Sequence, residues 1–113
     1  MEHNRHANDI VEITEPRLIV SNAGDILDLL ANTHAKALIL RREQLAPEFF
    51  DLKTGLAGDI LQKFSTYDKR LAIIGDFSDV TSKALRDLIY ECNQVGRTIF
   101  VPTTQAALEI FGL

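Results

Sequence analysis

Short apolar runs alternate along the chain with stretches in which apolar residues recur every three to four positions. Four runs are continuous or rich in β-branched residues, as buried strands are: residues 10–14, 37–40, 71–74 and 98–101. The helical spacing predicts four helices, over about residues 21–34, 54–67, 81–95 and 103–111. One more strand is predicted at residues 18–20, pairing with the first strand as a hairpin around Pro16.

The predicted helix ends carry the expected capping residues. Ser21 or Asn22 can cap the first helix, and Gly96 ends the third helix as a C-cap glycine does. The third and fourth helices begin at hydroxyl pairs, Thr81 or Ser82 and Thr103 or Thr104. The third helix has an apolar stripe that we expect to face inward: Leu85, Leu88, Ile89, Cys92 and Val95.

The order of these elements predicts the fold class. Two strands and a helix are followed by a strand–helix unit repeated three times, which indicates an α/β fold with right-handed crossovers. We expect a mostly parallel sheet of about five strands, an antiparallel edge hairpin and about four helices. Residues 10–113 are predicted to form a single α/β domain, and residues 1–9 a disordered N-terminal tail.

Composition limits the classes of protein that fit. The 113 residues include 12 Lys and Arg against 16 Asp and Glu, a net charge of −4, and 46% hydrophobic residues. An acidic chain is a poor general binder of nucleic acid, and the apolar content is too high for disorder. A single Cys excludes an intramolecular disulfide. With no apolar leader or membrane-length segment, we expect a cytoplasmic protein with no cofactor.

Polar residues follow the predicted strands at the edge where α/β sheets bind ligands. Arg41 and Arg42 follow the third strand, Asp76 follows the fourth, and residues 51–58 lead into the second helix. Ordinary turns and caps account for these residues as well as a binding site does. Within the last segment, the candidates for a phosphate or ligand site are Asp51, Lys53, Thr54 and Gly55.

Residues 50–58 are the least generic stretch of the chain. Thr54 is the predicted N-cap of the second helix, and Gly55 and Gly58 each cost up to about 1 kcal/mol inside a helix. Either close approach of a ligand or partner, or tight helix–sheet packing, offsets that cost. The stretch lacks the order of a nucleotide-hydrolysing phosphate loop, so such hydrolysis is not expected.

Three other groups of residues receive less weight. His3 and His6 lie in the predicted tail, where adventitious metal binding is the most we expect. Cys92 falls on an apolar stripe and is predicted to be an inert thiol. The exposed side of the third helix carries Arg86, Tyr90 and Glu91, either as a solvated face or as a partner surface.

Three blocks resemble domain-of-unknown-function family 4180. They are FFDLKTGLAGDILQKF at residues 49–64, LAIIGDFS at residues 71–78 and SKALRDLIYECN at residues 82–93. The resemblance covers nearly the whole chain and implies a small bacterial or archaeal protein. That family has no assigned activity, so the resemblance implies no mechanism.

The element order is also similar to that of STAS domains, the anti-sigma-factor-antagonist fold. Those domains carry an Asp-Ser-Ser-Gly-like segment at the start of the second helix, and a partner kinase phosphorylates its hydroxyl. Here Asp51, Thr54 and Gly55 stand at the equivalent place, with one extra residue and with Lys53 beside the hydroxyl. The resemblance implies that Thr54 is the phospho-acceptor of a regulatory module.

Two functions therefore stay open at the level of sequence. The first is a non-catalytic STAS-like module that binds a protein partner and is switched at Thr54. The second is a small-ligand-binding protein or enzyme, with a phosphate- or nucleotide-type ligand held by Arg41, Asp51, Thr54 and Asp76. Self-association as a homodimer is compatible with either function.

Overall fold

The spatial order of the strands follows their order in the chain. The computed structural model describes residues 2–112, which form one five-stranded sheet in the order β1-β2-β3-β4-β5. β1 pairs antiparallel with β2, and the other neighbours pair parallel. The strands are β1 (His3–His6), β2 (Ile10–Ile13), β3 (Ala37–Arg41), β4 (Arg70–Ile74) and β5 (Thr98–Val101).

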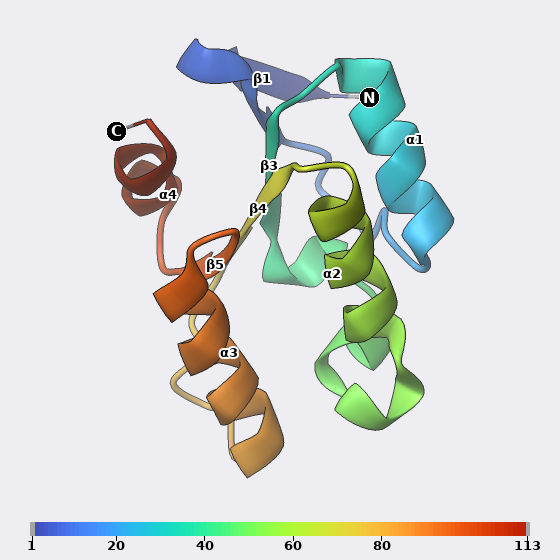
Figure 1. The fold of residues 1–113 in the computed structure, drawn as a ribbon, viewed down its shortest axis with the longest axis vertical. Coiled ribbons are helices and arrows are strands. Elements are labelled where there is room, and N and C mark those ends of the chain that lie inside the picture. Colours follow the sequence, from blue (N-terminus) through green and yellow to red (C-terminus); the bar gives the residue numbers. More distant parts are fainter. Residues whose placement is uncertain (1, 113) are drawn as a thin grey trace.

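Within residues 2–112, four α-helices cover the two faces of this sheet unequally. The helices are α1 (Ala23–Thr33), α2 (Leu56–Thr66), α3 (Lys83–Val95) and α4 (Thr104–Phe111). The first three connect neighbouring parallel strands, and crossovers of one hand place them all on one face. Only α4, which follows the last strand, packs on the other face (Figure 1). The predicted α/β fold class is confirmed.

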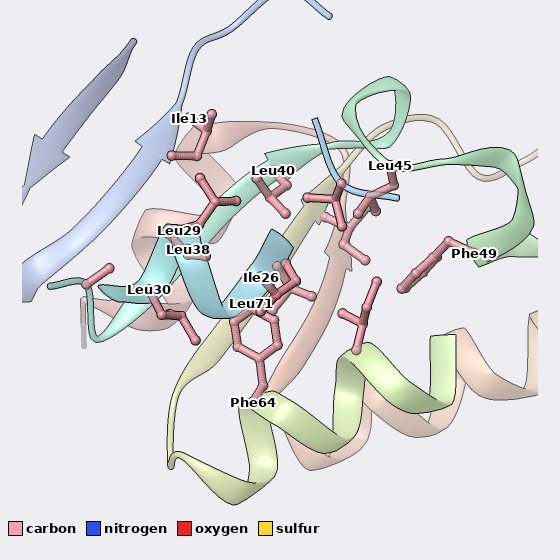
Figure 2. Close-up of a cluster of buried hydrophobic side chains, with 14 of the residues drawn as sticks. Ile13, Ile26, Leu29, Leu30, Leu38, Leu40, Leu45, Phe49, Phe64 and Leu71 are labelled. Atoms are coloured by element: carbon pink, nitrogen blue, oxygen red, sulfur yellow. The ribbon is translucent and has the colours of Figure 1, made fainter. Parts of the chain in front are cut away.

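The central strands are buried on both faces, which explains their continuous apolar sequence. Leu38, Leu40 and Leu71 point into the larger cluster beneath the helices of one face (Figure 2). Ile73 belongs to the same cluster. The neighbours of these four residues in the sequence point the opposite way, because successive side chains alternate along a strand. The second cluster comprises nine buried residues: Ile10, Ala37, Ile39, Ala72, Ile74, Ile99, Val101, Ala107 and Phe111.

The N-caps of α1, α3 and α4 and the C-cap of α3 agree with the sequence prediction. Asn22, Ser82 and Thr103 each accept a hydrogen bond from the backbone N–H three residues later, at 3.0, 3.2 and 3.1 Å. Gly96 ends α3 with a φ of 87°, a left-handed conformation that favours glycine. Among residues 2–112, none of the helices combines the length and apolar character that crossing a membrane requires.

One residue of the predicted α3 stripe does not face the core. The Val95 side chain is 80% exposed, whereas Leu85 is buried and Leu88, Ile89 and Cys92 are partly buried. Val95 follows Leu85 by ten residues, which places it about 80° around the helix from Leu85, at the margin of the buried stripe.

The N-terminal segment forms an edge strand where the sequence predicts a disordered tail. β1 is polar and largely exposed, so it lacks the apolar pattern that identifies a strand. Asn8 and Asp9 make the tight connection to β2 with φ values of 63° and 57°, a conformation these residue types tolerate. Arg5 also donates a hydrogen bond to the carbonyl of Thr33 at the end of α1. Met1, at the start of the predicted tail, lies outside the described residues.

The hairpin predicted from residues 18–20 is wrong. β2 already has β1 on one side and β3 on the other, so no edge is free for a second pairing. The segment instead runs beside the residues that follow β3. Val20 forms a parallel bridge with Leu45 and donates to the Gln44 carbonyl at 3.0 Å.

A fully buried glutamine joins these loops. Gln44 is 0% exposed, and its Oε1 accepts a hydrogen bond from the Arg41 N–H at 2.7 Å. Its Nε2 donates to the carbonyls of Ile13 at 3.0 Å and Glu15 at 2.7 Å. The side chain therefore bonds to carbonyls beyond Glu12, the last β2 residue that is paired with β3.

Replacing Gln44 by leucine should lower the free energy of unfolding by about 2 kcal/mol, because it leaves the part-buried Arg41 N–H without an acceptor. Urea unfolding followed by circular dichroism measures the change. The control is Gln94→Leu on the exposed side of α3, which should change stability by less than about 0.5 kcal/mol. Equal effects of the two substitutions would show that the Gln44 bonds do not support the fold.

Candidate functional site

Arg42 lies at the centre of the carboxyl edge of the sheet. Its Nη1 donates to the Asp76 carbonyl at 2.6 Å and to Asp79 Oδ1 at 2.9 Å. Its guanidinium carbon lies 5.4 Å from the ring centroid of Phe50 and 5.3 Å from that of Phe77. This one side chain thus joins the loop after β4 to the loop before α2.

Arg41 binds a different loop, the segment that follows β2. Its Nη2 donates to the Glu15 carbonyl at 2.9 Å, and its Nε lies 3.4 Å from the Glu43 carboxylate. Consecutive residues at a strand end point in opposite directions, so the two arginines do not form one paired cationic site. Arg41 instead holds the segment that leaves β2.

Four phenylalanines form a row beneath Arg42. The ring centroids of Phe49 and Phe50 are 5.0 Å apart, those of Phe50 and Phe77 are 6.4 Å apart, and those of Phe77 and Phe100 are 5.3 Å apart. The row joins the 3₁₀ turn Pro47–Phe50, the loop after β4 and strand β5. No role for this row was predicted from the sequence. The sequence does hold a signal for the row. Phe50 follows β3 and Phe77 follows β4, and the carboxyl ends of parallel strands meet at one edge of the sheet.

A second 3₁₀ turn, Leu52–Thr54, leads into α2. Asp51 Oδ1 accepts from the Lys53 N–H at 3.2 Å. The Thr54 hydroxyl lies 2.7 Å from the Glu48 carbonyl and 2.9 Å from the Asp51 carbonyl, and it accepts from the Leu56 N–H at 3.2 Å. The residues from Asp51 to Gly55 are exposed except Leu52, which is partly buried.

The structure does not support the explanations that the sequence offered for Gly55 and Gly58. Gly55, not Thr54, is the N-cap residue of α2, and its φ of 80° requires a residue that tolerates the left-handed region. Apart from neighbouring residues and the backbone of its own helix, no atom lies within 4 Å of the place where a Cβ on Gly58 would stand. Neither tight packing nor close approach within the chain therefore explains Gly58.

Gly75 and Asp76 form the turn after β4. A Cβ on Gly75 would lie 3.0 Å from the Arg42 Cβ, so the glycine lets that side chain pass close to the turn. Hydrogen bonds from the Ser78 hydroxyl and N–H hold the pKa of the exposed Asp76 carboxyl below its ordinary value, and the charge of Arg42 acts in the same direction. Asp76 therefore stays ionised at neutral pH.

Two shallow cavities flank the row of phenylalanines. One, of about 260 Å³, lies between the turn after β4 and the end of β5, with Phe77 and Phe100 in its wall. The other, of about 540 Å³, borders Arg42 itself, with Leu18, Pro47 and Phe50 also in its wall. No hydrogen bond or ion pair within residues 2–112 joins the side chains of Arg41, Asp51, Thr54 and Asp76 to one another. The structure gathers a different set around Arg42.

The remaining candidates lie away from this edge. Arg86, Tyr90 and Glu91 are all exposed on α3, with 67% of Tyr90 accessible. Burial, with a smaller contribution from the charge of Glu91, raises the pKa of the Cys92 thiol, which disfavours the reactive thiolate. His6 Nε2 lies 3.1 Å from Glu12 Oε1. In the part of the chain that the structure describes, no group of three His, Cys, Asp or Glu residues is placed to hold a metal ion.

The fold is that of an α/β protein whose strands lie in the sheet in the order of the sequence. At the carboxyl ends of the strands, its exposed surface lies over the row of phenylalanine rings. The chain belongs to the family described as Domain of unknown function (DUF4180), which matches residues 5–110. The resemblance to that family is thereby confirmed from β1 to α4. No curated protein and no solved structure gives a significant match to the chain.

Replacing Arg42 by methionine should lower the free energy of unfolding by about 1–2 kcal/mol, since it removes two hydrogen bonds and two cation–π contacts while keeping an unbranched apolar stem. Chemical unfolding measures this loss. The control, Arg17→Met, removes only the pairing of an exposed arginine with Glu15 and should cost less than about 0.5 kcal/mol. A loss no larger than the control's would contradict the central place of Arg42 at this edge.

Proposed function

We propose that the chain is a non-catalytic, cytoplasmic regulatory module that binds a protein partner at the start of α2 and is switched by phosphorylation of Thr54. The observation that carries the proposal is the place of the Thr54 hydroxyl. It is exposed, it lies at the N-terminus of an 11-residue helix, and it already accepts a hydrogen bond from the first N–H of that helix. The similarity of the element order to STAS domains supports the same position.

The local electrostatics favour a phosphate in one respect and oppose it in another. The helix dipole and the free N–H groups of the first turn stabilise an anion there by about 0.3–1 kcal/mol. Lys53 can pair with the phosphate, whereas Glu48, Asp51 and Asp59 repel it. The four ionised side chains sum to 1 − 3 = −2, and phosphorylation adds roughly −1.5 to −2 more. The modification would therefore change the charge of the surface strongly.

The transfer itself requires a kinase and a nucleoside triphosphate. The bond from the γ-phosphorus to the bridging oxygen breaks, and a bond from that phosphorus to Thr54 Oγ1 forms. The hydroxyl proton leaves to a base of the kinase, and the nucleoside diphosphate departs. The esterified oxygen then no longer donates to the carbonyls of Glu48 and Asp51, so the 3₁₀ turn before α2 loses a bond.

Two features favour a binding surface over a catalytic site at this edge. The strand order does not reverse, so the sheet lacks the crevice that forms at a topological switch point. The guanidinium groups of Arg41 and Arg42 are already engaged by backbone carbonyls. The ligand-binding alternative therefore receives less support than partner binding.

Protein expressed in its own host should gain the mass of one phosphoryl group, and the gain should disappear in Thr54→Ala. Intact-mass spectrometry measures it, with Thr54→Ser as a variant that keeps the acceptor hydroxyl. The matched control is Thr81→Ala, which removes an exposed hydroxyl elsewhere and should leave the modification in place.

Pull-downs with Thr54→Ala and Thr54→Glu should differ by at least one partner, because only the second carries charge at the site. An unmodified wild-type chain together with identical partner sets for the two variants would refute the switch.

A further inference from the structure

Cations gather at the opposite, amino-terminal edge of the sheet although the chain as a whole is acidic. A cavity of about 730 Å³ lies there, beside the ends of α2 and α3 and the starts of β3 and β4. Four cationic side chains and one carboxylate line it: Lys36, Lys69, Arg70, Arg97 and Asp68. We call these five residues the basic cluster. It lies at the other end of the strands from Arg42.

The two arginines of the basic cluster already have structural partners. Arg97 Nη1 donates to the Lys69 carbonyl at 3.2 Å and forms an ion pair with Asp68 at 3.1 Å. Arg70 Nη2 donates to the carbonyl of Gly96 at 3.1 Å, and its guanidinium carbon lies 4.2 Å from the ring centroid of Phe111. These contacts satisfy carbonyls near the ends of α2 and α3, so helix capping accounts for both arginines.

Capping does not account for the two lysines. Within residues 2–112, the ammonium groups of Lys36 and Lys69 have neither a hydrogen bond nor an ion pair. The side chains of the basic cluster sum to 4 − 1 = +3, and two nearby helix C-termini contribute roughly −0.5 each, which leaves about +2. A cavity with this excess charge attracts anions.

An apolar cavity adjoins the basic cluster. It has a volume of about 340 Å³, and its wall consists of Leu27, Leu30 and Ala31 of α1 together with Tyr67 and Lys69. Tyr67 and Lys69 line both cavities, and the Tyr67 side chain is 54% exposed. A ligand can therefore contact the cationic and the apolar part at the same time, across the Tyr67 ring.

We infer that this edge binds a phosphomonoester joined to an apolar or aromatic group. The phosphate, with a charge of roughly −1.5 to −2, matches the excess of about +2 and lies between Lys36 and Lys69. The apolar group lies against Tyr67 and the α1 residues. A simple anion would use only the first part and an uncharged apolar molecule only the second. The inference does not depend on the start of α2 or on Thr54.

The probe is 1-naphthyl phosphate, titrated at low ionic strength and followed by backbone-amide NMR. It should bind about tenfold or more tightly than either inorganic phosphate or 1-naphthol, because each of these occupies one part of the site. The shifted amides should be those of residues 30–36, 67–70 and 95–97. Affinity should fall as salt rises, since exposed charges are screened.

The variant Lys36→Gln/Lys69→Gln should weaken this binding about tenfold without unfolding the chain, because neither ammonium has a partner to lose. The matched control is Arg17→Gln/Lys83→Gln, which brings the net charge to the same −4 − 2 = −6 at distant exposed positions. The control should bind as tightly as the unaltered chain.

A second arm distinguishes a soluble ligand from a lipid headgroup. Phosphatidylcholine vesicles with and without phosphatidic acid are sedimented with the protein. Binding that is lost when the two lysines are replaced supports the site. If naphthyl phosphate binds in this way, the ligand is a soluble phosphomonoester; if only the phosphatidic-acid vesicles do, the ligand is a lipid headgroup. Binding of neither, or an equal loss in the matched control, overturns the inference.

Discussion

The two-sided burial of β3 and β4 is the constraint on which the rest of the structure depends. Each strand presents leucine or isoleucine to the larger cluster and alanine or isoleucine to the smaller one. Three right-handed crossovers place α1, α2 and α3 on the same face, so none of these helices covers the second face. The short helix α4 supplies that cover with Ala107 and Phe111.

The same topology shapes both ends of the sheet. At the carboxyl edge, sequential strands bring their exit loops together without the crevice of a topological switch point, and Arg42 packs with its row of phenylalanines between the loops. At the amino-terminal edge, helix ends point their carbonyls toward the strand starts, which favours cations there. The carboxyl edge of the sheet therefore has a surface over packed phenylalanine rings, and the amino-terminal edge has an open cationic cavity.

Much of the fold was predictable because its central elements carry local signals. The apolar runs of β3, β4 and β5, the hydroxyl and amide caps and Gly96 all depend on residues that are near one another in the sequence. β1 was not predictable from its own four polar residues, since its stability comes from pairing with β2 and from the bond between Arg5 and Thr33. Gln44 gave no signal either, because the two carbonyls to which its Nε2 donates lie about thirty residues away in the sequence. The start of α2 was found from its glycines and Thr54, but the Arg42 contacts and the basic cluster arise only when distant loops meet.

Hydrogen exchange of the backbone amides tests the two-sided burial most directly. Burial on both faces predicts that the amides of residues 38–40 and 71–73 exchange last, through global unfolding, while those of β1 and α4 exchange earlier through local opening. Exchange of the β3 and β4 amides as fast as those of β1 would contradict it.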